Sequence, residues 1–327
     1  MDKKLKKLIS GYRASVRTAV ELIGRSGIPL PVTSRSWIET DIPTHGTLEG
    51  GISYYKHGNG CLVDLPSGSV DFDFGWLGEI DGFDSWRLTK FAGSELANYG
   101  FETKGAVENS FDAAVKSGEL VQSGSILYYV RASERTLASE IRIDIPNDAL
   151  PHHDQDEVVA MSVHSFLAAD LMRENYKKLS AKLEKNRYLS QKDEVGFRVY
   201  FSSWLAYLYA TCEKFVDPKM PCLLAENRPE NFRELIPKSE EIMRLIKLHM
   251  DPLRKFRNNV FHTRVDIKPI LQFAADDAGR LSWAGELHSS MNEFFSMYRT
   301  LCEVHYLTHD RLGESQVGKE HTKKKVE

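Results

Sequence analysis

The feature that most constrains the fold is a polar, proline-containing stretch near the middle of the chain, Pro146–Asp156. It separates two regions that differ in their pattern of apolar residues. A chain of 327 residues is long for one compact domain and comfortable for two. We therefore expect an α+β domain over residues 1–150, an all-α helical bundle over 156–312 and a disordered polar tail over 313–327.

The same stretch contains four side chains that can bind metals: His152, His153, Asp154 and Asp156. No second ligand group at a recognisable spacing completes a zinc site. We therefore interpret the stretch as a solvated linker.

The first domain is expected to combine helices with a small antiparallel sheet. The segment Lys4–Arg25 repeats apolar residues at near-helical spacing. Three strand-like segments follow, separated by the turn sequences GNG and PSG, and they predict an antiparallel meander: Gly51–Lys56, Cys61–Leu65 and Ser69–Phe74. Two helices, at about 82–99 and 106–117, and a last strand at 125–130 complete the domain.

Four aspartates gather in the segment Val70–Leu88, VDFDFGWLGEIDGFDSWRL. Asp71 and Asp73 alternate with phenylalanines, so a strand would place the rings on the core face and both carboxylates on the opposite face. Asp81 and Asp84 come near a helix start, where aspartate is favoured as a cap. One interpretation is a polar strand face followed by a cap; the other is a metal or general acid/base site in this domain.

The second half contains long amphipathic segments: Glu194–Phe215, Ser239–His249, Pro252–His262 and Trp283–Tyr298. Asp251 before Pro252 predicts a helix start, because aspartate caps well and proline fits the first helical position.

Within the helix 252–262, Leu253, Phe256 and Val260 form the expected buried stripe. Another face carries Arg254, Asn258 and His262 at i, i+4 and i+8, so Asn258 lies one turn below the His262 ring and can orient it.

Arg257 and His262 supply the chemistry that RNA cleavage needs without a metal. Histidine titrates near neutrality and can donate or accept a proton as a phosphodiester bond breaks. Arginine stays charged, and its planar fork fits two phosphate oxygens. Together they suffice when the 2′-OH of the RNA is the nucleophile, so we expect no cofactor and no metal.

The segment Leu253–Thr263, LRKFRNNVFHT, resembles the HEPN motif, R-(N/H/D)-x-x-x-H, on Arg257, Asn258 and His262. Proteins of that superfamily are mostly small all-helical domains, and many are metal-independent endoribonucleases. The resemblance covers roughly residues 156–311. It implies that these three residues are catalytic, that RNA is the substrate and that the protein is a bacterial toxin or phage-defence effector.

The HEPN arrangement also has a long apolar helix with an acidic residue near its end, which implies a supporting role for Glu213 beside Arg257. Members commonly form dimers. Arg257 and His262 are about 140° apart around a helix, an offset that favours two copies of the motif facing each other. We therefore expect a homodimer.

The stretch Gly51–Arg131 resembles a bacterial domain of unknown function, with GFDSWRL as its most specific string. That resemblance implies no activity. We interpret the domain as a sensor or adaptor that offers a surface to a protein partner.

A different class of function stays open. A lone Arg-x4-His is a weak pattern, and an arginine at the edge of a buried helix face is often paired with a core carboxylate. The helical domain would then be a catalytically silent scaffold that acts through protein or RNA interactions, for instance as an antitoxin or immunity partner.

The charge of the chain bears on how it can bind RNA. The net charge is −3, whereas proteins that bind long nucleic acids by bulk electrostatics are usually basic. Contacts to RNA would then be local, through Arg257 together with Arg254, Lys255 and Arg264.

The location of the protein is inferred from its cysteines and its apolar segments. Four cysteines without a CxxC pair suggest reduced thiols in the cytoplasm. The segment FSSWLAYLYATC is too short and polar to span a membrane, so no membrane contact is expected.

Overall fold

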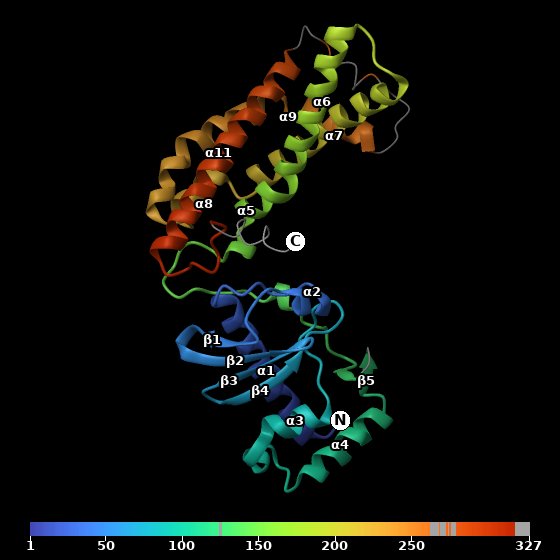
Figure 1. Ribbon diagram of the computed structural model, residues 1–327, viewed down its shortest axis with the longest axis vertical. Helices are drawn as coiled ribbons and strands as arrows, with labels where there is room; N and C mark the ends of the chain where they lie inside the picture. The colour runs from blue at the N-terminus through green and yellow to red at the C-terminus, as the bar shows by residue number, and fades with distance from the viewer. Residues whose placement is uncertain (124–125, 262–267, 269–272, 274, 276–278, 318–327) are drawn as a thin grey trace, which may run out of the picture. The chain divides into compact units, whose positions relative to one another are not determined.

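The computed structural model describes residues 1–123, 126–261, 268, 273, 275 and 279–317 (Figure 1). The chain forms two compact units. Unit 1 contains Met1–Ile145 with Arg311–Gly313, and unit 2 contains Pro146–Asp310 with Glu314–Glu327. The chain first leaves unit 1 after Ile145 and enters unit 2 at Pro146, where the polar stretch begins.

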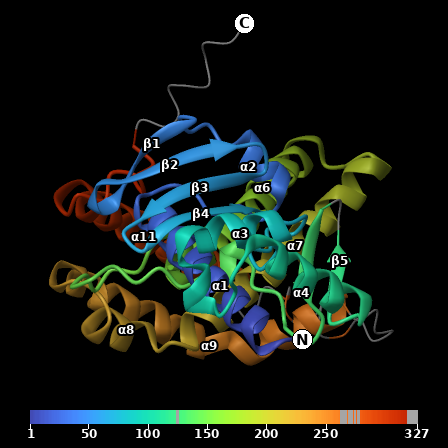
Figure 2. The same ribbon diagram turned by 90° about the horizontal axis from the view of Figure 1, so that it is seen from below.

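Unit 1 is built on a four-stranded antiparallel sheet in the order β1-β2-β3-β4 (Figure 2). The strands are β1 (His45–Leu48), β2 (Ile52–His57), β3 (Gly60–Leu65) and β4 (Gly68–Asp73). The expected meander is confirmed as β2 to β4, and β1 adds an edge strand that the sequence did not predict. The β2–β3 turn contains Gly58 at a φ of 44°, a backbone conformation that favours glycine.

The helices of unit 1 contribute most of its remaining core. In α1 (Lys3–Arg25) the apolar residues at near-helical spacing are all buried, which confirms the amphipathic pattern. They are Leu5, Leu8, Ile9, Tyr12, Val16, Val20 and Ile23. α2 (Ser34–Glu39) buries Trp37, and the centre of its ring lies 4.8 Å from the centre of the Phe74 ring. α4 (Lys104–Lys116) and the hairpin of β5 (Leu120–Ser123) with β6 (Leu127–Val130) complete the unit.

The helix expected over 82–99 is shorter than predicted. α3 spans Ser85–Ala92 and ends at Gly93, where φ is 50°. A 3₁₀ segment, Gly93–Tyr99, follows it. Glycine permits this left-handed end, and the apolar pattern continues across it, so the periodicity alone did not reveal the break.

Unit 2 is all-helical, as expected. Its helices are α5 (Glu157–Met161), α6 (Leu167–Asn186), α7 (Gln191–Val216), α8 (Met220–Glu226), α9 (Ile236–Phe261) and α11 (Arg280–Thr308). α7 packs against α6 and α9, and α9 packs against α11. Aromatic side chains fill the core, among them Phe215, Phe256, Phe294 and Tyr298. Among the described helices, none combines the length and apolar character needed to cross a bilayer.

The stretch Pro146–Asp156 is not the solvated linker that its composition suggests. Asp156 is fully buried, and its carboxylate caps α5 by accepting a hydrogen bond from the amide of Val158 at 2.8 Å. It also accepts one from Arg228 Nη2 at 3.0 Å and one from the hydroxyl of Tyr298 at 2.7 Å. Asp156 therefore belongs to the buried structure of unit 2.

The expected disorder of the tail does not extend to its first residues. Glu314 and Ser315 are buried, and the Ser315 hydroxyl donates a hydrogen bond to Glu303. Residues 318–327 lie outside the described part of the chain.

Candidate functional site

The predicted catalytic arginine lies on α9 and faces the end of α7. One terminal nitrogen of Arg257, Nη2, lies 3.7 Å from Oε2 of Glu213. Its guanidinium carbon lies 5.1 Å from the centre of the Tyr209 ring, close enough for a cation–π contact. The contact expected between Glu213 and Arg257 is therefore present.

Tyr209 links the two charged groups. Its hydroxyl donates a hydrogen bond to Oε1 of Glu213 at 2.7 Å. Burial of the ring, together with the negative charge of Glu213, raises the pKa of Tyr209 to about 12. The phenol therefore stays protonated at neutral pH and remains a donor to the carboxylate.

Asn258 lies beside Arg257 and restrains it. Nη1 of Arg257 donates a hydrogen bond to Oδ1 of Asn258 at 2.9 Å. Asn258, Tyr209 and Glu213 thus contact the guanidinium, whose side chain keeps 33% of its surface exposed. An arginine held in this way is accessible and loses little conformational freedom when it binds an oxyanion.

The histidine of the motif, His262, lies outside the described residues, and so does Arg264. The predicted pair Arg257/His262 and the predicted contact of Asn258 with the His262 ring therefore remain predictions.

The two other basic residues expected at the site already have an acidic partner. Arg254 Nη2 lies 2.7 Å from Oδ1 of Asp251, and Lys255 Nζ lies 2.8 Å from Oδ2. All three side chains are more than half exposed, so these ion pairs are weak and another anion could compete with Asp251.

The helix start predicted at Asp251 is corrected by the structure. α9 begins well before Pro252 and continues beyond it, but its backbone departs from helical geometry at His249, where φ is −138° and ψ is 23°. Asp251 already lies in the helix beyond this kink, and its carboxylate binds side chains. Because proline blocks the hydrogen bond to the residue four positions earlier, the kink places Pro252 in the first turn of a new segment.

The buried stripe of this segment matches the prediction, with one addition. Leu253 and Phe256 are fully buried, and Val260 packs against the same core. Asn259, three residues after Phe256, is buried too. Its Nδ2 donates to the carbonyl of Lys255 at 2.9 Å, and within the described residues its Oδ1 has no hydrogen-bond partner. The i+3 spacing from Phe256 was the signal that could have revealed it.

The polar face predicted for Asp71 and Asp73 is present on β4, but it is buried. Asp71 and Asp73 at the end of β4 are buried, because Arg87 of α3 reaches them: its Nη2 lies 2.8 Å from Asp73 Oδ2 and its Nε 3.5 Å from Asp71 Oδ1. Asp84 caps α3, as predicted, by accepting a hydrogen bond from the amide of Arg87 at 2.7 Å, and it also pairs with the Arg87 guanidinium. Asp81 is not a cap.

The surroundings of Asp71 and Asp73 act in opposite directions on their protonation. Burial opposes the ionisation of Asp71, but hydrogen bonds and charges from His57 and Lys90 outweigh it and lower its pKa to about 2. Burial raises the pKa of Asp73 in spite of the attraction of Arg87. In the part of the chain that the structure describes, no three His, Cys, Asp or Glu side chains are grouped to hold a metal. This cluster is therefore an ionic network centred on Arg87.

Comparison with known proteins bears on unit 1. Residues 5–130 match the model of a family described as a domain of unknown function (DUF6896). The first part of the chain thus contains a domain of unknown function, as the GFDSWRL string suggested. A search of curated proteins and a search of solved structures each gave no match.

Proposed function

We propose that unit 2 is a metal-independent endoribonuclease of the HEPN type. The observation that supports this most is the state of Arg257: Glu213, Tyr209 and Asn258 contact its guanidinium, and a third of the side chain is exposed. An arginine that only stabilised the core would be buried with its carboxylate. This one is oriented and remains open to a ligand.

The proposed reaction uses the RNA's own 2′-OH. A base removes the proton of that hydroxyl, the O2′–P bond forms, and the P–O5′ bond breaks as a proton is delivered to the departing O5′. The products are a 2′,3′-cyclic phosphate and a 5′-hydroxyl. Arg257 binds the phosphate oxygens, on which charge accumulates, and His262 moves the protons.

The other residues act around this pair. Asn258 and Glu213 are positioning residues, because each contacts the Arg257 guanidinium. Arg254, Lys255 and Arg264 would contact the RNA backbone on either side of the cleaved bond. A homodimer would bring two motifs together and give one composite cleft.

The role of unit 1 in this proposal is regulatory. It would act as a sensor or adaptor that recognises a signal or a protein partner and controls RNA cleavage, as in a toxin or phage-defence effector. We place this activity in the cytoplasm, which agrees with four cysteines that are all free thiols.

The test is RNA cleavage by the full-length protein in EDTA, with the ends of the products identified. We expect cyclic phosphate ends, and loss of cleavage in Arg257→Ala and His262→Ala. Arg244→Ala is the matched control, because Arg244 is an exposed arginine on the same helix. Light scattering on the same samples should give a dimer.

Two results would contradict the proposal. Cleavage that needs Mg²⁺, or that survives both Arg257→Ala and His262→Ala, would show a different enzyme. RNA binding without cleavage would favour the silent scaffold.

A further inference from the structure

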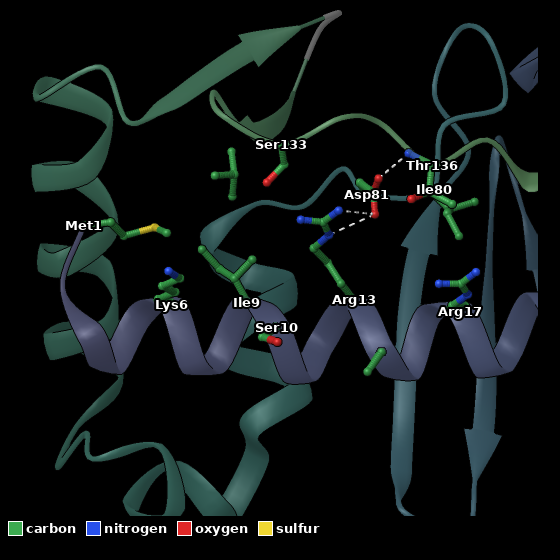
Figure 3. A pocket seen from close by; sticks show the side chains of 12 residues that line it. Met1, Lys6, Ile9, Ser10, Arg13, Arg17, Ile80, Asp81, Ser133 and Thr136 are labelled. Atoms are coloured by element: carbon green, nitrogen blue, oxygen red, sulfur yellow. Dashed lines mark hydrogen bonds and ion pairs between the residues drawn. The ribbon is translucent and has the colours of Figure 1, made fainter.

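Unit 1 contains a pocket of about 370 Å³ along one side of α1 (Figure 3). Four polar side chains of α1 line it at i, i+4, i+7 and i+11, a spacing that keeps them on one face of the helix: Lys6, Ser10, Arg13 and Arg17. The opposite wall comes from later segments of unit 1 and includes Asp81, Ser133 and Thr136. The volume is within the range of small-molecule sites.

The helix that forms the pocket is strongly basic, although the chain as a whole is slightly acidic. α1 carries seven cationic side chains and a single carboxylate: Lys3, Lys4, Lys6, Lys7, Arg13, Arg17 and Arg25, against Glu21. The pocket lining itself holds three cations and one carboxylate, Asp81. An anion would therefore be attracted to this wall.

The one carboxylate in the lining is already satisfied. Nε and Nη2 of Arg13 both lie 2.8 Å from Oδ1 of Asp81, and the amide of Thr136 donates to the other oxygen (Figure 3). Asp81 thus neutralises Arg13 and anchors it in the wall. It leaves the charges of Lys6 and Arg17 uncompensated by the lining.

Lys6 and Arg17 are available to a ligand. Arg17 is 59% exposed and makes only a loose contact with Glu21, at 3.6 Å. For Lys6, which is exposed, no acidic partner lies within ion-pair distance among the described residues. The two positions are eleven residues apart, or about 16 Å along the helix axis, so a single phosphate cannot reach both.

The spacing and the lining define the chemistry of the ligand. Lysine and arginine side chains are long enough to reach toward each other across this gap, so together they could hold the two ends of a polyphosphate chain, with Ser10 and Arg13 between them. The apolar part of the lining includes Ile9, Ile80 and Val130, which can cover a less polar body. We propose that this pocket binds a nucleoside triphosphate, with the polyphosphate along α1 and the nucleoside against the apolar residues.

This site is independent of RNA cleavage by unit 2, and its test needs no catalytic readout. Isothermal titration of the full-length protein with ATP, in EDTA, should give saturable binding. Lys6→Gln and Arg17→Gln should each weaken it about tenfold, the effect of losing one charge-assisted contact. Inorganic tripolyphosphate should bind more weakly than ATP, because it leaves the apolar residues uncovered.

Lys3→Gln is the matched control: it removes the same charge from an exposed lysine of α1 that does not line the pocket. Its ATP affinity should stay within twofold of the wild type, and the melting curves of all three variants should coincide with that of the wild type. An equal loss of ATP affinity in Lys3→Gln would show that ATP is attracted only by the overall positive charge of α1, and this would overturn the proposal. Absence of ATP binding at millimolar concentration would overturn the proposal too. Tripolyphosphate binding as tight as that of ATP would show that the nucleoside makes no contact in the pocket, which would contradict that part of the proposal.

Discussion

Replacing Asp156 by asparagine tests whether the polar stretch at the start of unit 2 is structural. The fully buried carboxylate is the counter-ion of Arg228, which is itself buried, and it also binds the hydroxyl of Tyr298. Removing one partner of a buried ion pair costs about 3–5 kcal/mol, because the other charge stays buried without compensation. Asparagine keeps the shape and one acceptor oxygen, so we expect about 3 kcal/mol.

For a unit of this size, a loss of about 3 kcal/mol corresponds to a fall in melting temperature of roughly 6–12 °C. Urea denaturation followed by circular dichroism at 222 nm measures the loss, because the described elements of unit 2 are helices. Asp154→Asn is the control, because Asp154 is exposed and lies two residues away. A change in Asp156→Asn of less than about 0.5 kcal/mol, as for a surface residue, would refute the reasoning.

Two further predictions concern unit 2. Glu213→Gln should change its stability by no more than about 0.5 kcal/mol, because the contact with Arg257 is 3.7 Å long and both side chains are at least one third exposed, so solvent screens it; chemical denaturation checks this. Burial of His288, opposed by its hydrogen bond with Asp170, lowers the pKa of the ring to about 4 from an ordinary 6.5, so neutral histidine is the folded form. The neutral ring therefore contributes to the free energy of unfolding, and this contribution is complete above pH 6.5. It falls as the pH drops toward 4, by about 3 kcal/mol in total. Urea denaturation at pH 7 and pH 5 should show about 2 kcal/mol of this fall in the wild type and much less in His288→Asn; equal falls in both would contradict it.

The sequence predicted best the features that depend on local periodicity. The amphipathic pattern of α1 and the turn glycines of the meander specify their elements from neighbouring residues alone. β1 is only four residues long and has no repeating pattern to detect. The contact of Glu213 with Arg257 was expected from the HEPN resemblance, which places an acidic residue near the end of the long apolar helix, and the apolar pattern alone did not predict it.

Other features depend on partners far away in the chain. Asp156 looked like a linker residue because Arg228 and Tyr298, which bury it, are 72 and 142 positions away. The pattern of β4 predicted that Asp71 and Asp73 share a polar strand face, but nothing within β4 indicates that Arg87 of α3 covers that face. A polar pattern cannot distinguish a carboxylate that faces water from one that faces a buried guanidinium.

The network around Arg87 gives the string GFDSWRL a structural role. A side chain on Gly82 would collide with Tyr129, whose hydroxyl would lie 2.9 Å from the added carbon. Asp84 starts α3, and Arg87 joins that helix to the sheet through Asp73. Gly82, Asp84 and Arg87 thus each contribute to the packing of this part of unit 1.

Trp86 is the exception within the string. Its side chain is 59% exposed, with the ammonium group of Lys90 4.7 Å from the ring centre. The other contacts of the string therefore join α3 to the sheet, whereas the Trp86 side chain faces solvent. A substitution of Trp86 should leave this frame intact and change only the surface that unit 1 presents.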